Sequence, residues 1–146
     1  LVFDDGLAQL LVGEELHLAV DRQLQVASRH RRQLLAHVLD TEARIVLDED
    51  PARALELADA AIAEAEAVAN PKALLDGLVT RARALERTDR RDEALATYER
   101  AAAIARDHAS PARRRDVLTA WAGSLVAAGR EKDAIPLYRE ALAGAR

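Results

Sequence analysis

Cysteine and methionine are absent from this chain of 146 residues, and only four residues are aromatic: Phe3, Tyr98, Trp121 and Tyr138. Without cysteine, no disulfide can support the fold and no thiol is available for catalysis. A reducing compartment is the simplest location, and we expect the cytoplasm. Aromatic, threonine and isoleucine residues are scarce, whereas alanine, leucine, glutamate and arginine all favour helices. We therefore expect an all-α protein.

Excess positive charge and long apolar runs are also lacking. The net charge is −4, so the chain has no general attraction to nucleic acid or to an anionic membrane surface. No apolar stretch approaches the length needed to span a bilayer. Arginine clusters at 29–32 and 113–115 have no interleaved aromatic residues, and we interpret them as solvated helix ends. We expect neither a nucleic acid nor a membrane as the partner of this segment.

What the chain does contain is an internal repeat of forty residues. Ala54, Ala94 and Ala134 are forty apart, and other side chains recur in the same register. The recurring columns are Val38, Leu78 and Leu118; Ile45, Leu85 and Leu125; Leu55, Leu95 and Ile135; Tyr98 and Tyr138; and Pro71 and Pro111. Repeats of roughly 20 to 50 residues form stacked units that cannot bury their apolar faces alone. The sequence therefore predicts an α-solenoid of antiparallel helix hairpins.

Three dipeptides mark helix starts: Asp50-Pro51, Asn70-Pro71 and Ser110-Pro111. Each places a capping side chain before a proline, whose missing N–H costs nothing at the first helical position. We expect Asp89 to cap a further helix and Gly129 to close one in a left-handed conformation. The predicted helices are 32–48, 51–69, 72–87, 90–108, 112–128 and 131–145.

The first 31 residues fit the repeat less well. Gly13 and two following glutamates look like a helix start, after which four apolar residues share one helical face: Leu16, Val20, Leu24 and Ala27. No proline or glycine separates Glu14 from Asp50, so one unbroken helix is an alternative to two. We favour a break between Ser28 and Arg32, because the repeat register requires one. Residues 1–31 then form a degenerate preceding unit or capping helices, and three hairpins occupy 32–71, 72–111 and 112–146.

These residues resemble the tetratricopeptide repeat. In that pattern, a small residue and a turn residue precede alanine, a large aliphatic, an aromatic and another alanine. The last unit fits it through Ala122, Gly129, Ala134, Ile135, Tyr138, Ala141 and Leu142. The middle unit fits through Ala82, Ala94, Leu95, Tyr98 and Ala101, with Asp89 in place of glycine. In the first unit, Glu42 replaces the small residue and Ala58 the aromatic. The usual period is about 34 residues, so these units look like the extended form seen in kinesin light chains and bacterial regulators, and the resemblance covers residues 32–146.

The resemblance implies a right-handed superhelix whose first helices line a concave groove for an extended peptide or a partner helix. The side chains expected to line it are Leu39, Ala43, Val46, Asp76, Val79, Arg83, Glu86, Arg87, Asp116, Thr119 and Gly123. A groove that is apolar at one end and carries arginine in the middle suits a protein or peptide partner with acidic groups. The lysine and asparagine with which some members of the family grip a C-terminal carboxylate are missing from the corresponding positions.

Nothing in the sequence favours catalysis. No serine has a positioned histidine, and no glycine-rich phosphate loop is present. His30 and His37 share a helical face, but the spacing fixes no third metal ligand. We expect no enzyme activity, no metal and no cofactor.

We interpret the chain as a protein-binding or peptide-binding scaffold. Arginine far outnumbers lysine, as in GC-rich genomes, which suggests the regulatory part of a larger bacterial protein. One alternative is a homo-oligomerisation module, with a homodimer formed through apolar ends that contain Leu10, Leu11, Leu137 and Leu142. Another is a ligand-sensing or peptide-sensing domain of a transcription regulator or signalling ATPase.

The sequence also supports a specific prediction for each of two residues at equivalent positions of the repeat. Trp121 follows Leu118 by three residues and precedes Leu125 by four, so we expect it in the core. Arg81 is forty residues before Trp121. We expect either that its stem packs while its head reaches water, or that it pairs with a carboxylate such as Glu86 or Asp92.

Overall fold

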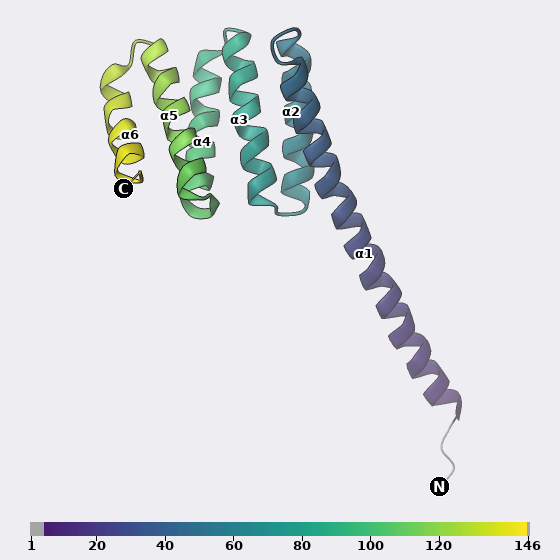
Figure 1. Ribbon diagram of the computed structural model, residues 1–146. Helices are drawn as coiled ribbons and strands as arrows, with labels where there is room; N and C mark the ends of the chain where they lie inside the picture. Colours follow the sequence, from purple (N-terminus) through teal and green to yellow (C-terminus); the bar gives the residue numbers. More distant parts are fainter. Residues whose placement is uncertain (1–4, 146) are drawn as a thin grey trace.

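The computed structural model describes residues 5–145, and this part of the chain forms six α-helices and no strand. The helices are α1 (Asp5–Val46), α2 (Pro51–Ala67), α3 (Pro71–Arg87), α4 (Arg91–His108), α5 (Pro111–Ala127) and α6 (Glu131–Ala143). Each helix packs against the next one along the chain, and α1 also contacts α3. Figure 1 shows the shorter helices standing side by side, with α1 reaching far beyond them. The predicted all-helical solenoid is confirmed.

Helix starts follow the capping chemistry that the sequence predicts. The side chains of Asp50, Asn70 and Ser110 each accept a hydrogen bond from the backbone N–H three residues later, at 3.1 to 3.2 Å. A proline begins each of these helices. The caps satisfy backbone donors that a helix leaves without partners in its first turn. The three predicted boundaries are therefore confirmed.

The turns after α3 and α5 share one geometry. Gly129 has φ of 76°, as predicted for a left-handed cap, and Asp89 has φ of 61°. In both turns the next residue, Arg90 or Arg130, donates its N–H to the carbonyl five residues earlier, at 2.9 and 2.8 Å. The prediction that Asp89 caps α4 is wrong, because Arg90 occupies that position without a side-chain capping bond. Asp89 instead closes α3, since aspartate tolerates the left-handed conformation better than most residues with a β-carbon.

The predicted helix break between Ser28 and Arg32 is absent. Helix α1 continues for 42 residues, so residues 5–31 are its first part, while residues 1–4 lie outside the described range. Two contacts hold this region of α1 to the end of α2: Arg29 Nη2 donates to the Val68 carbonyl at 3.1 Å, and Arg32 pairs with Glu64 at 3.6 Å. Without an internal proline or glycine near the predicted break, local propensity favours one continuous helix over the repeat register.

The core of the stack is built from the aliphatic and alanine columns of the last two units. Leu78 and Leu118 are each 1% exposed, and Leu85 and Leu125 are 0% and 4% exposed. The alanines that mark the repeat, Ala54, Ala94 and Ala134, are also buried. The members of each of these columns therefore share one environment from α2 to α6. Alanine at the contacts lets neighbouring helices approach closely.

The forty-residue repeat register does not hold in α1. Val38 is 48% exposed and Ile45 is 72% exposed, although their counterparts forty residues later are in the core. Helix α1 instead buries Ala36, Ala43 and Leu47 against its neighbours. It is thus turned about its own axis relative to α3. Because α1 is at the end of the described stack and is packed on one side only, small residues can decide which face meets α2.

One buried polar pair fixes α1 against α3. Asp40 is 4% exposed and Thr80 is 2% exposed, and the Thr80 hydroxyl donates to Asp40 Oδ1 at 2.6 Å. Arg44 approaches the same carboxylate with its Nε 3.3 Å from Asp40 Oδ2. A buried carboxylate is costly unless such donors surround it. This pair therefore specifies how the first helix sits on the stack.

Removing the Thr80 hydroxyl tests this contact. Thr80→Val keeps the shape of the side chain but takes a donor from a buried carboxylate, so we expect the free energy of unfolding to fall by about 1–3 kcal/mol. Urea denaturation measures the change. Thr88→Val is the matched control, because the Thr88 hydroxyl donates to the Ala84 and Leu85 carbonyls of its own helix, at 3.1 and 3.2 Å. Equal losses in the two variants would show that the Asp40–Thr80 bond has no special role.

Candidate partner-binding groove

A hollow between α3 and α5 brings together four of the predicted groove residues. Arg83, Glu86 and Arg87 line it from α3, and Gly123 lines it from α5. Its volume is about 520 Å³. Five lining residues were missed by the sequence reasoning: Arg91, Tyr98, Ala120, Ser124 and Ala127. The family pattern assigns the groove to first helices, whereas Arg91 and Tyr98 belong to α4.

The other predicted residues do not join this hollow. Ala43 and Val79 are 0% and 5% exposed, so they belong to the core and offer no surface to a partner. Leu39 and Val46 are half-buried and pack beside Ala43. The rotation of α1 explains why its predicted groove face is turned inward.

Three predicted polar residues lie elsewhere on the first helices. Asp76 accepts a hydrogen bond from Arg113 Nη2 at 2.9 Å, which links α3 to α5. Asp116 and Thr119 are exposed but are not among the residues that line the hollow. The structure therefore brings together the residues predicted for the middle of the groove, whereas the residues predicted for its two ends lie elsewhere.

Repeat geometry places a tyrosine beside each first helix of the last two units. Tyr98 is buried at 2% exposure and lies close to Glu86 and Arg83. Forty residues later, the position of Arg83 is taken by Gly123, where an added β-carbon would be 4.0 Å from Tyr138 Oη. Glycine thus removes the side chain that would stand over Tyr138, which is 42% exposed. The hollow is open on the α5 side because the residues there are small.

Guanidinium groups dominate the charge of the hollow. Within residues 5–145, Arg83 forms no ion pair with a carboxylate, although its charge lies near the Tyr98 hydroxyl. Arg87 pairs with the exposed Asp48. Arg91 donates to the Ala127 carbonyl at 3.3 Å and is 3.6 Å from the exposed Asp89. With Glu86 as the one carboxylate in the lining, the surface of the hollow is positive.

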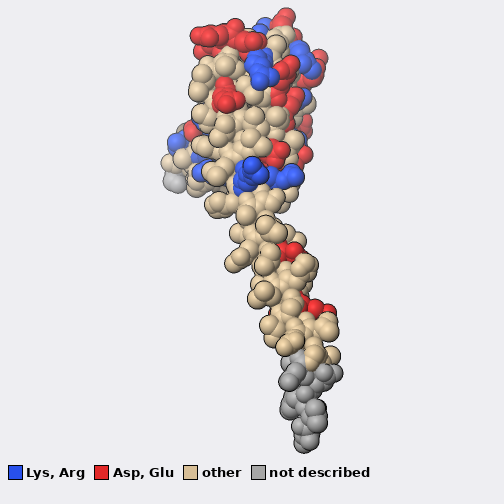
Figure 2. Space-filling view, turned by 90° about the vertical axis from the view of Figure 1, so that its right-hand side faces the viewer, with Lys and Arg blue, Asp and Glu red and all other residues tan. Residues whose placement is uncertain are grey.

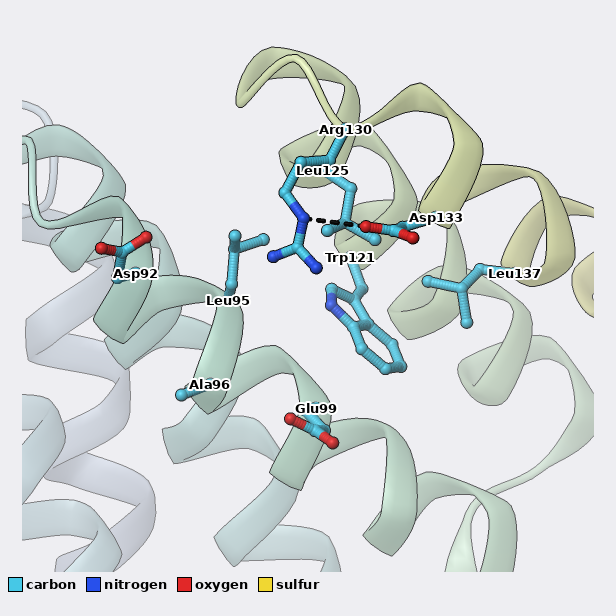
Figure 3. A pocket seen from close by; sticks show the side chains of 9 residues that line it. All are labelled: Asp92, Leu95, Ala96, Glu99, Trp121, Leu125, Arg130, Asp133 and Leu137. Carbon is cyan, nitrogen blue, oxygen red and sulfur yellow. Dashed lines mark hydrogen bonds and ion pairs between the residues drawn. The ribbon is translucent and has the colours of Figure 1, made fainter.

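A second hollow lies on another side of α5, around Trp121. It has a volume of about 410 Å³ and is lined by α4, α5 and α6. Figure 3 shows the indole among Leu95, Leu125 and Leu137, with Arg130 and Asp133 above it. The Arg130 Nε is 2.8 Å from Asp133 Oδ2. Trp121 is half-buried and packs against the main core, so the core prediction holds for one part of its surface while the rest lines this hollow.

Arg81 occupies the equivalent place one unit earlier and has partners that the sequence did not suggest. Its Nε is 2.8 Å from Asp59 Oδ1, and its Nη1 donates to Thr97 Oγ1 at 2.5 Å. The expectation of a carboxylate partner is confirmed, but that partner is Asp59 and neither Glu86 nor Asp92. Both actual partners lie on second helices, α2 and α4, which a pattern read along one helix does not bring together. A half-buried guanidinium of α3 therefore links α2 and α4 at the position where the last unit has an indole.

Metal sites and membrane spans are two further kinds of feature that a helical chain can carry. Across residues 5–145, no group of three or more histidine, aspartate or glutamate side chains is arranged to hold a metal ion. In the same range, no helix combines the length and the apolar character that crossing a bilayer would require.

Comparison with known proteins identifies the fold. No protein-family model and no curated protein sequence matches this chain. Among solved structures, the chain is similar to the crystal structure of the TPR domain of Arabidopsis FLU, with a TM-score of 0.69 at 16% sequence identity. The match covers 77% of this chain and 95% of that one. At this identity the likeness concerns the fold alone, and it confirms that the chain folds as a tetratricopeptide-repeat solenoid.

The titration of Tyr98 tests the geometry of the groove. Burial raises the pKa of Tyr98 above the ordinary tyrosine value, and the negative charge of Glu86 raises it further. In Glu86→Gln that charge is gone, so we expect the pKa of Tyr98 to fall while burial still holds it above the ordinary value. Ultraviolet absorbance against pH measures this in a Tyr138→Phe background, where Tyr98 is the single tyrosine, and the two proteins are compared at each pH at which circular dichroism shows both to be folded. An unchanged titration would show that Glu86 does not act on the Tyr98 hydroxyl.

Proposed function

We propose that this chain is a non-catalytic protein-interaction domain that holds a segment with acidic groups in the hollow between α3 and α5. The observation that carries the proposal is Arg83, whose exposed guanidinium faces an open hollow and has no carboxylate partner in the described chain. The solenoid fold supports the proposal, because stacked hairpins present extended surfaces that are suited to binding.

The chemistry of the lining favours carboxylates over other groups. A guanidinium presents a planar set of donors that matches a carboxylate in a two-point hydrogen bond. Arg87 and Arg91 already contact the exposed carboxylates of Asp48 and Asp89. Exposed ion pairs of this kind contribute only about 0–1 kcal/mol, so an incoming carboxylate can replace them at little cost.

The remaining lining suits the apolar side chains of such a segment. Ala120, Gly123 and Ala127 present small surfaces along α5, and Tyr98 contributes an aromatic wall. A segment that alternates acidic and apolar residues would therefore place its carboxylates toward α3 and its apolar side chains toward α5. This division follows from the charge of one wall and the small side chains of the other.

Charge reversal at the groove tests the proposal. The probes are a fluorescent peptide that alternates glutamate and leucine, and an analogue with lysine in place of glutamate. We expect the acidic peptide alone to bind, and Arg83→Glu with Arg87→Glu to weaken it by about 100-fold or more, since each charge-assisted bond contributes roughly 1.5–3 kcal/mol. Fluorescence anisotropy measures the affinity, and circular dichroism confirms that helicity is retained.

A control with the same change in net charge separates the groove from general electrostatics. Arg53 and Arg139 are exposed and lie outside the lining of the hollow. Arg53→Glu with Arg139→Glu should leave affinity within about three-fold of the original protein. Equal losses in the two double variants, or binding of the lysine peptide, would contradict the proposed site.

A further inference from the structure

Two hollows of the stack occupy equivalent places in the repeat. The Arg81 hollow lies among α2, α3 and α4 and has a volume of about 430 Å³. The Trp121 hollow, described above, lies among α4, α5 and α6. Four positions of the two linings correspond at a spacing of forty residues: Asp59 and Glu99, Arg81 and Trp121, Glu93 and Asp133, and Thr97 and Leu137. The two hollows can therefore be compared position by position.

The chain itself supplies a cation to the Arg81 hollow. The Arg81 Nε is 2.8 Å from Asp59 Oδ1, and its Nη1 donates to Thr97 Oγ1 at 2.5 Å. The second carboxylate of this lining, Glu93, accepts hydrogen bonds from Arg90 at 2.9 and 2.5 Å. Both carboxylates that line the Arg81 hollow therefore have a guanidinium partner within the chain.

The Trp121 hollow keeps one of these two ion pairs and lacks the other. Arg130 Nε is 2.8 Å from Asp133 Oδ2, which repeats the second pair of the Arg81 hollow forty residues later. Because an indole replaces the first guanidinium, Glu99 has no cation beside it. Within residues 5–145, neither Glu99 nor Asp92, a further carboxylate of this lining, forms an ion pair. Three carboxylates and one guanidinium line the hollow, so two negative charges are uncompensated.

The indole is a second feature of the Trp121 hollow that favours a cation. Trp121 is half-buried, and Figure 3 shows its ring on α5 and the Glu99 carboxylate on α4 bordering the same hollow. The face of an indole attracts a guanidinium, which stacks on the ring while its planar donors reach a carboxylate. Leu137, expected from the sequence at an apolar end of the chain, is instead buried in the core and lines the hollow from α6. Its apolar surface suits the methylene stem of an arginine.

We propose that the Trp121 hollow is a second binding site, which takes an arginine side chain from a basic segment of a protein partner. The incoming guanidinium has the role that Arg81 has one unit earlier: it pairs with Glu99 and stacks on Trp121. This site shares no lining residue with the groove between α3 and α5. The two sites also have opposite charge, so a segment with acidic groups and a segment with arginine bind independently.

The fluorescence of Trp121 measures binding at this site, because Trp121 is the single tryptophan of the chain. The probes are a blocked peptide of glycine and serine with one leucine-arginine-leucine motif in its middle, and the same peptide with lysine in place of arginine. We expect a saturable change in emission with the arginine peptide below about 1 mM. We expect none with the lysine peptide in the same range, because an ammonium is more strongly hydrated and has no planar set of donors. The absence of a saturable change with the arginine peptide would overturn the proposal.

Two matched glutamate substitutions test which carboxylate pairs with the arginine. Glu99→Gln keeps the shape of the side chain and removes a charge-assisted hydrogen bond, so the arginine peptide should bind at least about ten-fold more weakly. Glu49→Gln is the control, because it removes one charge from the acidic turn at residues 48–50, outside the hollow. Figure 2 shows acidic side chains gathered at the end of the stack that holds this turn. The control should change affinity less than about two-fold, and equal losses in the two variants would overturn the proposal.

A third variant rebuilds the arrangement of the Arg81 hollow. In Trp121→Arg, the introduced guanidinium pairs with Glu99 inside the chain, so the arginine peptide should bind at least about ten-fold more weakly. Isothermal titration calorimetry measures the affinity of this variant, and circular dichroism checks its helicity. Unchanged affinity in the folded variant would contradict the proposed site. The Arg83→Glu and Arg87→Glu double variant should still bind the arginine peptide, which separates failure of this site from failure of the groove.

Discussion

The structure depends on burial of first-helix aliphatic side chains between neighbouring second helices. Leu78 and Leu85 of α3 are almost completely buried, as are Leu118 and Leu125 of α5. Burying one such side chain contributes about 1.5–3 kcal/mol, and no hairpin can obtain this from its own two helices alone. Stability is therefore shared between units, and the outer helix faces are free to differ in chemistry.

The sequence predicted those features that local chemistry determines. The caps at Asp50, Asn70 and Ser110 and the left-handed turn at Gly129 follow from a few adjacent residues. The unbroken α1 was the less favoured of two alternatives, and its rotation was not predicted. The repeat register was extended to a helix that, among the described residues, is packed on one side only. Five lining residues of the groove were also missed. Arg91 and Tyr98 reach it only through the packing of α4 between α3 and α5, and the other three lie on α5 at positions that were not assigned to the groove.

Equivalent positions show how one backbone arrangement serves different purposes. The site that holds Arg81 in one unit holds Trp121 in the next, so an ion pair between hairpins is replaced by aromatic packing. The site that holds Arg83 holds Gly123 forty residues later. Arg83 gives the groove a charged wall on α3, and Gly123 leaves the opposite wall on α5 open. Asymmetry between units, rather than the repeat itself, creates the candidate binding site.

The first part of α1 extends beyond the helices against which the rest of α1 packs (Figure 1). In a globular protein most of the stability of a helix comes from tertiary packing of an apolar face. Residues 9–28 have exposed side chains throughout, so within one chain this segment has little packing to sustain it. Its exposed side chains include aliphatic residues on several sides of the helix, among them Leu11, Leu16, Leu18 and Val26. The helical form of this segment therefore rests on local helix propensity and on the contacts that Arg29 and Arg32 make with α2.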